Sequence, residues 1–136
     1  MDTSLGYMKM CEKAEEIQNG WKSNNGDFYT VKGSYNDASV MLFDYGLEFL
    51  KKSDLIWLPR QDQLQEMVRE KKTPETDMDE PNAMLLDRFY SWMFKERGGK
   101  WAFYDAGRAS MEQLWLAFCM SGRYGKKWER NKWVAQ

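Results

Sequence analysis

The segment 55–72 (LIWLPRQDQLQEMVREKK) changes its hydrophobic period at a proline, and this change constrains the fold more than any other feature of the chain. Residues 55–58 form a short apolar run, which is typical of a buried strand. Pro59 follows directly, and proline fixes φ at a value that suits the first turn of a helix. On a helix over residues 60–71, the apolar side chains share one side. The segment therefore predicts a strand followed at once by an amphipathic helix that docks on a sheet.

Three glutamines recur at every second position of this segment, as Gln61, Gln63 and Gln65. On a helix, Gln61 and Gln65 lie together, whereas Gln63 points toward the opposite margin. This geometry does not support a glutamine ladder that reads nucleic acid. Arg60 lies where the positive end of the helix dipole disfavours a cation. Two interpretations of Arg60 stay open, contact with a partner or a stacking cover over Trp57.

The rest of the chain alternates helical and strand patterns. Helices are predicted over residues 4–19, 81–97 and from a cap at Ser110 to near Gly122; strands are predicted over residues 28–32, 39–43 and 100–105, with a terminal hairpin around residues 128–133. Residues 44–54 (DYGLEFLKKSD) fit neither a helical nor a strand period well, and residues 71–82 (KKTPETDMDEPN) are expected to form an exposed, mobile acidic loop. We predict one domain over residues 1–136, an α+β fold with about four helices packed on a small, mainly antiparallel sheet.

The chain contains no histidine and two cysteines. Histidine is the commonest general base at neutral pH and the commonest metal ligand, so its absence excludes Ser-His-Asp, Cys-His and HExxH chemistry within this chain. Cys11 and Cys119 each lie in a predicted helix among apolar neighbours, where cysteine behaves as a small buried hydrophobe. The acids Asp77, Asp79 and Glu80 are expected to be solvated. We expect no enzyme activity, no cofactor and no metal site.

Cellular location follows from two segments of the sequence. The longest apolar run covers residues 114–120, which is far short of the roughly 20 residues that cross a bilayer. The first residues (MDTSLGYMKMCEK) lack the basic, apolar and small-residue regions of a signal peptide. We therefore expect the chain in the cytoplasm, without contact with a membrane.

Charge is divided unevenly along the chain. Residues 1–90 carry 11 basic and 17 acidic side chains, whereas residues 91–136 carry 9 basic and 4 acidic ones. Aromatic residues are interleaved with the basic ones in this last third, a combination that binds partner proteins, single-stranded nucleic acid or nucleotides. The sequence pI of about 5.6 argues against a dedicated nucleic-acid domain. The candidate binding residues are Trp57, Arg60, Asp62, Gln65, Trp101, Tyr104, Arg108, Arg123, Lys126 and Lys127.

Two motifs carry a family resemblance. IWLPRQDQLQEM (residues 56–67) and the ending RYGKKWERNKWV, together with GDFYTV near the N-terminus, resemble a family of small proteins of unknown function encoded by phages and prophages of Gram-positive bacteria. The family often has an Asp-Gly-type turn between its last two tryptophans, where this chain has ERNK.

The resemblance implies a phage accessory protein that acts in the bacterial cell. We expect it to bind a host or phage protein, with inhibition of a host defence as one such role. The alternative is a protein that binds nucleic acid or sequesters a nucleotide through its basic, aromatic C-terminal surface. The oligomeric state stays open, a homodimer included.

Overall fold

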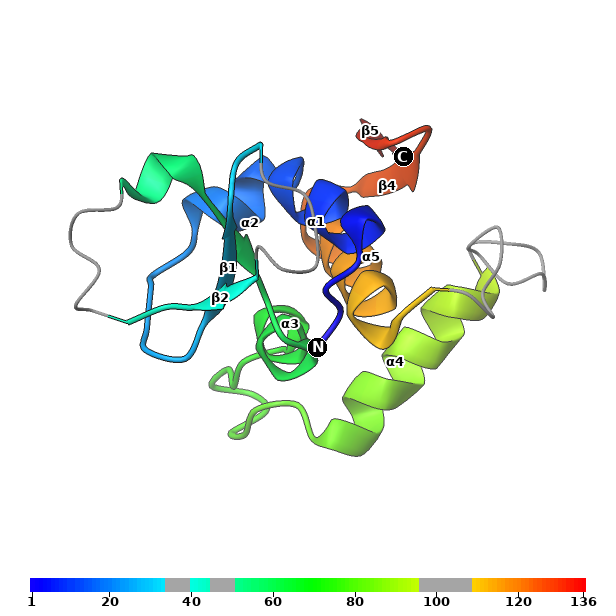
Figure 1. Ribbon diagram of the computed structural model, residues 1–136. Coiled ribbons are helices and arrows are strands. Elements are labelled where there is room, and N and C mark those ends of the chain that lie inside the picture. Colours follow the sequence, from blue (N-terminus) through cyan, green and yellow to red (C-terminus); the bar gives the residue numbers. More distant parts are fainter. Residues whose placement is uncertain (34–39, 45–50, 96–108) are drawn as a thin grey trace.

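The computed structural model describes residues 1–33, 40–44, 51–95 and 109–136 (Figure 1). Five α-helices lie within these residues: α1 (Leu5–Glu12), α2 (Glu15–Asn19), α3 (Gln61–Val68), α4 (Asn82–Lys95) and α5 (Met111–Tyr124). The strands are β1 (Phe28–Val31), β2 (Met41–Leu42), β3 (Leu55–Leu58), β4 (Lys126–Glu129) and β5 (Lys132–Ala135), and a 3₁₀ turn, η2, covers Lys52–Asp54. The predicted α+β class and the single small domain are confirmed.

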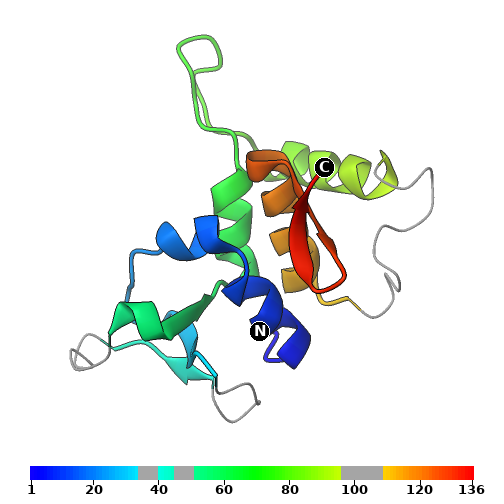
Figure 2. The same ribbon diagram turned by 90° about the horizontal axis from the view of Figure 1, so that it is seen from above.

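The part of the chain that the structure describes contains two antiparallel sheets. The first has the strand order β2-β1-β3, with Tyr29 opposite Trp57 and Phe28 opposite both Leu58 and Leu42. The second is the terminal hairpin β4-β5, with Trp128 opposite Trp133. Helices α1 and α3 lie beside the first sheet, α5 packs against α1 and α3 on the side away from this sheet, and α4 lies on the far side of α5 (Figures 1 and 2).

The predicted helix over residues 4–19 is divided into α1 and α2, which corrects the sequence interpretation. Ser4 caps α1 as its Oγ accepts from the N–H of Tyr7 at 3.2 Å. Ala14 then leaves the helical region, with φ −86° and ψ 67°. The break turns Gln18 back toward the strand β3, and its Nε2 donates to the carbonyl of Cys11 at 3.0 Å. The side chain thereby bonds a carbonyl at the end of α1.

The other predicted elements are largely present. The strand over residues 55–58 and the helix that follows Pro59 are confirmed, and β2 is shorter than predicted. Helix α5 extends past Gly122 to Tyr124, because the residue that adopts the left-handed conformation and ends the helix is Gly125, with φ 61°. The predicted strand over residues 100–105 lies outside the described residues.

The core joins the sheet to the helices. Its largest fully buried side chains include Trp115 from α5, Tyr7 and Met8 from α1, Tyr29 from β1 and Ile56 from β3. Both cysteines are buried, as predicted. Among the described residues, no helix combines the length and the apolar character that crossing a membrane requires.

Candidate functional site

Trp57, a candidate binding residue, lies in the core and is only 6% exposed. Its side chain is stacked on Trp21, with ring centroids 5.9 Å apart and planes 6° apart. Its backbone is bound by Gln18, whose Oε1 accepts from the N–H of Trp57 at 2.8 Å while Nε2 donates to its carbonyl at 3.0 Å. Trp57 therefore holds α2 to the edge of β3, and its indole is not available to a partner.

Arg60 precedes α3 and is bound to its surroundings. Its Nη1 donates to the carbonyl of Gly26 at 3.2 Å, and its Nε donates to Asp62 at 3.1 Å. These contacts direct the guanidinium toward the turn before β1 rather than over Trp57 as a cover. Asp62 is exposed, and Gln65 is partly exposed on α3.

A buried carboxylate, which the sequence interpretation did not single out, lies behind Arg60. Asp27 is 3% exposed and accepts from the indole Nε1 of Trp21 at 2.9 Å and from the backbone N–H of Asn24 at 3.0 Å. Gln63 completes the set, since its Nε2 donates to Asp27 at 2.7 Å and its Oε1 accepts from the N–H of Arg60 at 2.9 Å. Gln63, the glutamine that points away from Gln61 and Gln65, thus links α3 to the residue that precedes β1.

Three members of the predicted basic, aromatic C-terminal surface are engaged within the chain. Arg123 donates to the carbonyl of Met67 at 2.9 Å, Lys126 pairs with Glu16, and Lys127 lies 3.2 Å from Glu129. The hydrogen bond of Lys126 also lowers the pKa of the Glu16 carboxyl.

The two tryptophans of the terminal hairpin serve packing. The rings of Trp128 and Trp133 pack against each other, with their centroids 4.9 Å apart. Trp133 Nε1 donates to the carbonyl of Met10 at 3.0 Å. Trp101, Tyr104 and Arg108 lie outside the described residues. Within the described part, this surface therefore offers fewer free cations and rings than its sequence suggested.

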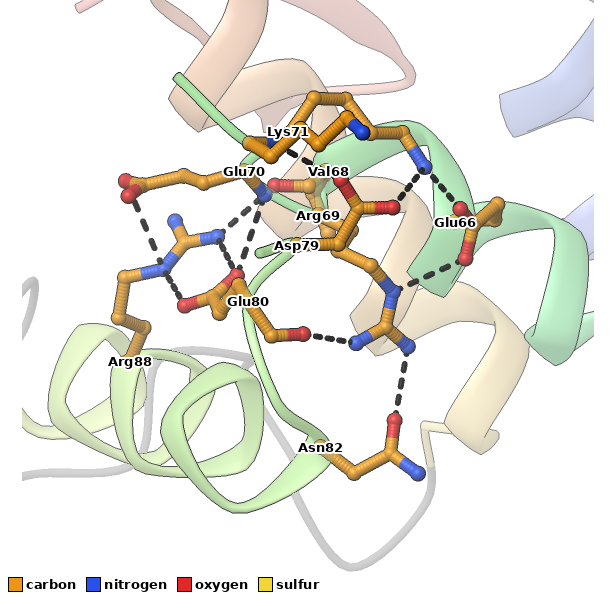
Figure 3. A network of polar contacts seen from close by, with 10 residues as sticks. Glu66, Val68, Arg69, Glu70, Lys71, Asp79, Glu80, Asn82 and Arg88 are labelled. Atoms are coloured by element: carbon orange, nitrogen blue, oxygen red, sulfur yellow. Dashed lines mark hydrogen bonds and ion pairs between the residues drawn. The ribbon is translucent and has the colours of Figure 1, made fainter. Parts of the chain in front are cut away.

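The acidic loop between α3 and α4 is fastened at its base, as Figure 3 shows. Glu80 was expected to be solvated, but it is only 8% exposed. Both of its carboxylate oxygens accept from Arg88, at 2.7 and 2.8 Å, and this contact lowers the pKa of the carboxyl. The backbone N–H of Glu80 donates to the carbonyl of Glu70 at 2.9 Å, so the two ends of the loop are tied together.

Arg69 adds a second clamp to the same loop. Its guanidinium donates to the carbonyl of Glu80 at 2.5 Å, to Asn82 Oδ1 at 2.8 Å and to Glu66 Oε2 at 2.9 Å (Figure 3). The loop thus projects from the body of the molecule on a rigid base, and Figure 2 shows it extending beyond α3 and α4.

The helix α4 that follows this loop exposes apolar side chains that the sequence analysis did not assign to binding. On α4, Leu86, Tyr90 and Phe94 recur every four residues and are 52%, 55% and 38% exposed, while Leu85, Phe89 and Met93 of the same helix are buried. Tyr90 and Phe94 contact each other, with centroids 4.7 Å apart. The sequence signal for this surface was the unusually wide apolar stripe of α4.

A groove of about 600 Å³ lies between the loop and the first turn of α4. Met78 from the loop and Met84 from α4 line it, and they are 60% and 59% exposed. Pro81 also lines the groove. Large apolar side chains that gather on a surface at this exposure are typical of an interaction site.

A second hollow, of about 840 Å³, lies between α2 and the start of β3. Lysines and glutamates both line it, among them Lys13, Lys32 and Glu15. Lys52 at its edge donates to the carbonyl of Trp21. Opposite charges on one wall give this hollow no clear preference for an ionic ligand.

Comparison of the chain with protein-family models, with curated proteins and with solved structures found no match. Within the described residues, the chain is a small α+β protein with an exposed, largely apolar face on α4 and an acidic loop whose base is held by Arg69 and Arg88.

Proposed function

We propose that this chain is a non-enzymatic phage or prophage accessory protein that acts in the cytoplasm of a bacterial host by binding a host protein. Inhibition of a host defence factor is the role that we favour. The phage context rests on the resemblance of residues 56–67 and of the C-terminal motif to phage and prophage proteins. The binding role rests on the outward face of α4.

The outward face of α4 carries the proposal because its chemistry is that of a protein interface. Aromatic residues and methionine are enriched at interfaces, and one buried aromatic anchor often supplies much of the binding free energy. Leu86, Tyr90 and Phe94 offer an aliphatic and two aromatic side chains on one side of a helix. A groove or helix in a partner protein that accepts side chains at this spacing would bury all three.

The buried side of α4 fixes this face in place. Phe89 is stacked on Trp115 of α5, with centroids 3.9 Å apart and planes 9° apart, and Trp92 Nε1 donates to Ser121 at 3.1 Å. Arg88, in the middle of the helix, binds Glu80, which lies just before the helix begins. A partner therefore meets a preorganised surface, which reduces the entropy lost on binding.

Affinity capture from host lysate tests the proposal. The tagged chain is compared with Leu86→Ser/Tyr90→Ser and with Leu42→Ser, a control of similar exposure, 57%, on the sheet (Figure 1). We expect a host protein, identified by mass spectrometry, to be retained by the wild type and by Leu42→Ser and lost by the double variant. Thermal unfolding of all three proteins checks that they fold.

Two results would overturn the proposal. One is a host protein retained equally by the double variant. The other is retention of nucleic acid or nucleotides alone, with the steep salt dependence of phosphate contacts, which would support the alternative of a sequestering protein.

A further inference from the structure

The groove beside the loop 70–80 has an apolar floor and a rigid frame. Met78, Pro81 and Met84 line it, and methionine surfaces adapt to different apolar side chains. Its volume of about 600 Å³ lies within the usual range of binding pockets. The salt bridge between Glu80 and Arg88 holds one wall against α4.

Three N–H groups at the base of the loop are already paired, which favours recognition of side chains over the addition of a strand. The N–H groups of Glu70 and Glu80 donate to Glu80 Oε2 and to the carbonyl of Glu70, at 3.2 and 2.9 Å. The N–H of Lys72 donates to Asp79 Oδ1 at 2.8 Å. A partner that adds a strand to an edge needs free N–H groups, and these three are occupied. Apolar side chains of a helix can bind in the groove without any free backbone N–H group.

The rim of the groove is acidic, although the whole chain has a net charge of −1. Residues 66–88 hold seven acidic and four basic side chains. Three of the four bases are paired with acids inside the segment, namely Arg69, Lys71 and Arg88. Glu70 and Asp79 line the groove together with Lys71, and their side chains are 74% and 49% exposed although Glu70 lies 3.9 Å from Arg88 and Asp79 lies 3.8 Å from Lys71. The resulting negative rim repels nucleic acid and favours cationic partners.

We propose that this groove is a docking site for a basic amphipathic helix of a partner protein. The apolar side chains of that helix enter between Met78 and Met84, and its lysines and arginines face Glu70 and Asp79. The inference goes beyond the proposed function, because it assigns a second site and names the chemistry of the segment that this site would bind. Leu86 lies on another side of α4 from Met84, because two helical positions differ by about 200°.

Fluorescence anisotropy with synthetic peptides tests the groove. The probe is a labelled 18-residue peptide (about five helical turns) of leucine and lysine, with leucine at three- and four-residue spacing. Two controls are a peptide of the same composition in scrambled order and one with glutamate in place of lysine. We expect the probe to bind at least about tenfold more tightly than either control, since affinity requires both the stripe and the charge.

Variants of the chain locate the binding. Met78→Ser/Met84→Ser should lower the affinity for the probe peptide by at least about tenfold, as expected for central anchor positions. Leu86→Ser should change this affinity less than about twofold. Glu70→Gln/Asp79→Asn should weaken it at low salt and flatten its salt dependence. Asn at position 79 keeps an oxygen that accepts from Lys72, so the loop is preserved. Circular dichroism and thermal unfolding verify folding.

Three results would overturn the inference: no binding of the probe, equal binding by Met78→Ser/Met84→Ser, or equal binding of the scrambled peptide. Each leaves the proposed function standing if host-protein capture still depends on Leu86 and Tyr90. Conversely, capture that ignores Leu86 and Tyr90 removes the proposed function, whereas peptide binding that depends on Met78 and Met84 still stands.

Discussion

The side-chain amide of Gln18 pairs with both backbone groups of Trp57, at 2.8 Å to the N–H and 3.0 Å to the carbonyl. One edge of β3 pairs with β1, and the other edge has no neighbouring strand. At that free edge, the Gln18 side chain makes the two hydrogen bonds with Trp57 that a neighbouring strand would make. The same Nε2 also bonds the carbonyl of Cys11, so the contact joins α1, α2 and the sheet at one point. An open strand edge leaves backbone donors and acceptors unpaired, and Gln18 pairs with those of Trp57.

Replacement of Gln18 by alanine should destabilise the fold by about 1–3 kcal/mol, because buried backbone groups of Trp57 and Cys11 lose their partners. Gln18→Glu should be intermediate, since a carboxylate accepts from the N–H of Trp57 but donates nothing to its carbonyl. Urea unfolding measures the free energy, and Asn19→Ala, an exposed neighbour, is the control. Equal stability of Gln18→Ala and wild type would show that water replaces the amide.

Glu80→Gln should remove a pH-dependent contribution to stability. Arg88 lowers the pKa of Glu80 in the folded state, so the folded state binds fewer protons than the unfolded state. The contribution is complete above the ordinary glutamate pKa of about 4.3 and is lost as the pH falls through the lower folded-state pKa. We expect Glu80→Gln to cost about 1–3 kcal/mol at pH 7 and progressively less below pH ~4.

Urea unfolding of wild type and Glu80→Gln at several pH values measures this difference. Asp87→Asn, an exposed neighbour on α4, should stay within about 0.5 kcal/mol of wild type at neutral pH. A constant difference between wild type and Glu80→Gln across the acid range would contradict the assigned ion pair.

Local patterns in the sequence were sufficient to predict most of the helices and strands. The Ser110 cap is confirmed by its Oγ, which accepts from the N–H of Gln113 at 3.1 Å, and the strand over residues 55–58 by its pairing with β1. Both depend on residues that are close in the chain, where hydrophobic period and capping chemistry are visible.

Contacts between distant residues were the ones that sequence reasoning missed. Gln18 lies 39 positions from Trp57, and nothing in the local pattern of either residue shows their pairing. Glu80 was expected to be solvated because its neighbours are acidic, yet Arg88 of the next helix buries it. The sequence indicated the exposed face of α4 only through the width of the apolar stripe on this helix. The helical period of the apolar residues does not tell which half of such a stripe packs inward.

The two cysteines should resist thiol reagents until the protein unfolds. Both are buried, which raises the pKa of the Cys119 thiol to about 12 and that of Cys11 further still. The thiolate is the reactive form, so its fraction near pH 8 is very small. Reaction with Ellman's reagent at pH 8 should be slow for the native chain and should release two equivalents in denaturant. Fast release of one equivalent without denaturant would contradict the burial of one thiol.

The turn of the terminal hairpin should accept Asn-Gly in place of Arg130-Asn131 with a gain in stability. Both residues have positive φ, 48° and 62°, as a type I′ turn requires, so the ERNK segment forms a tight turn without the Asp-Gly pair that is common in the resembled family. A left-handed conformation costs a residue such as arginine about 1 kcal/mol, whereas asparagine and glycine tolerate it. Because Trp133 bonds Met10, hairpin stability contributes to global stability.

Arg130→Asn/Asn131→Gly should therefore raise the free energy of unfolding by about 0.5–1 kcal/mol, less than the full left-handed penalty because glycine also gains freedom in the unfolded chain. Lys132→Asn, in the adjoining strand where φ is not positive, should lower it instead, since asparagine is unfavourable in strands. Urea unfolding followed by tryptophan fluorescence measures both changes. If the double variant is no more stable than wild type, either Arg130 does not adopt the left-handed conformation or the hairpin opens independently of the core.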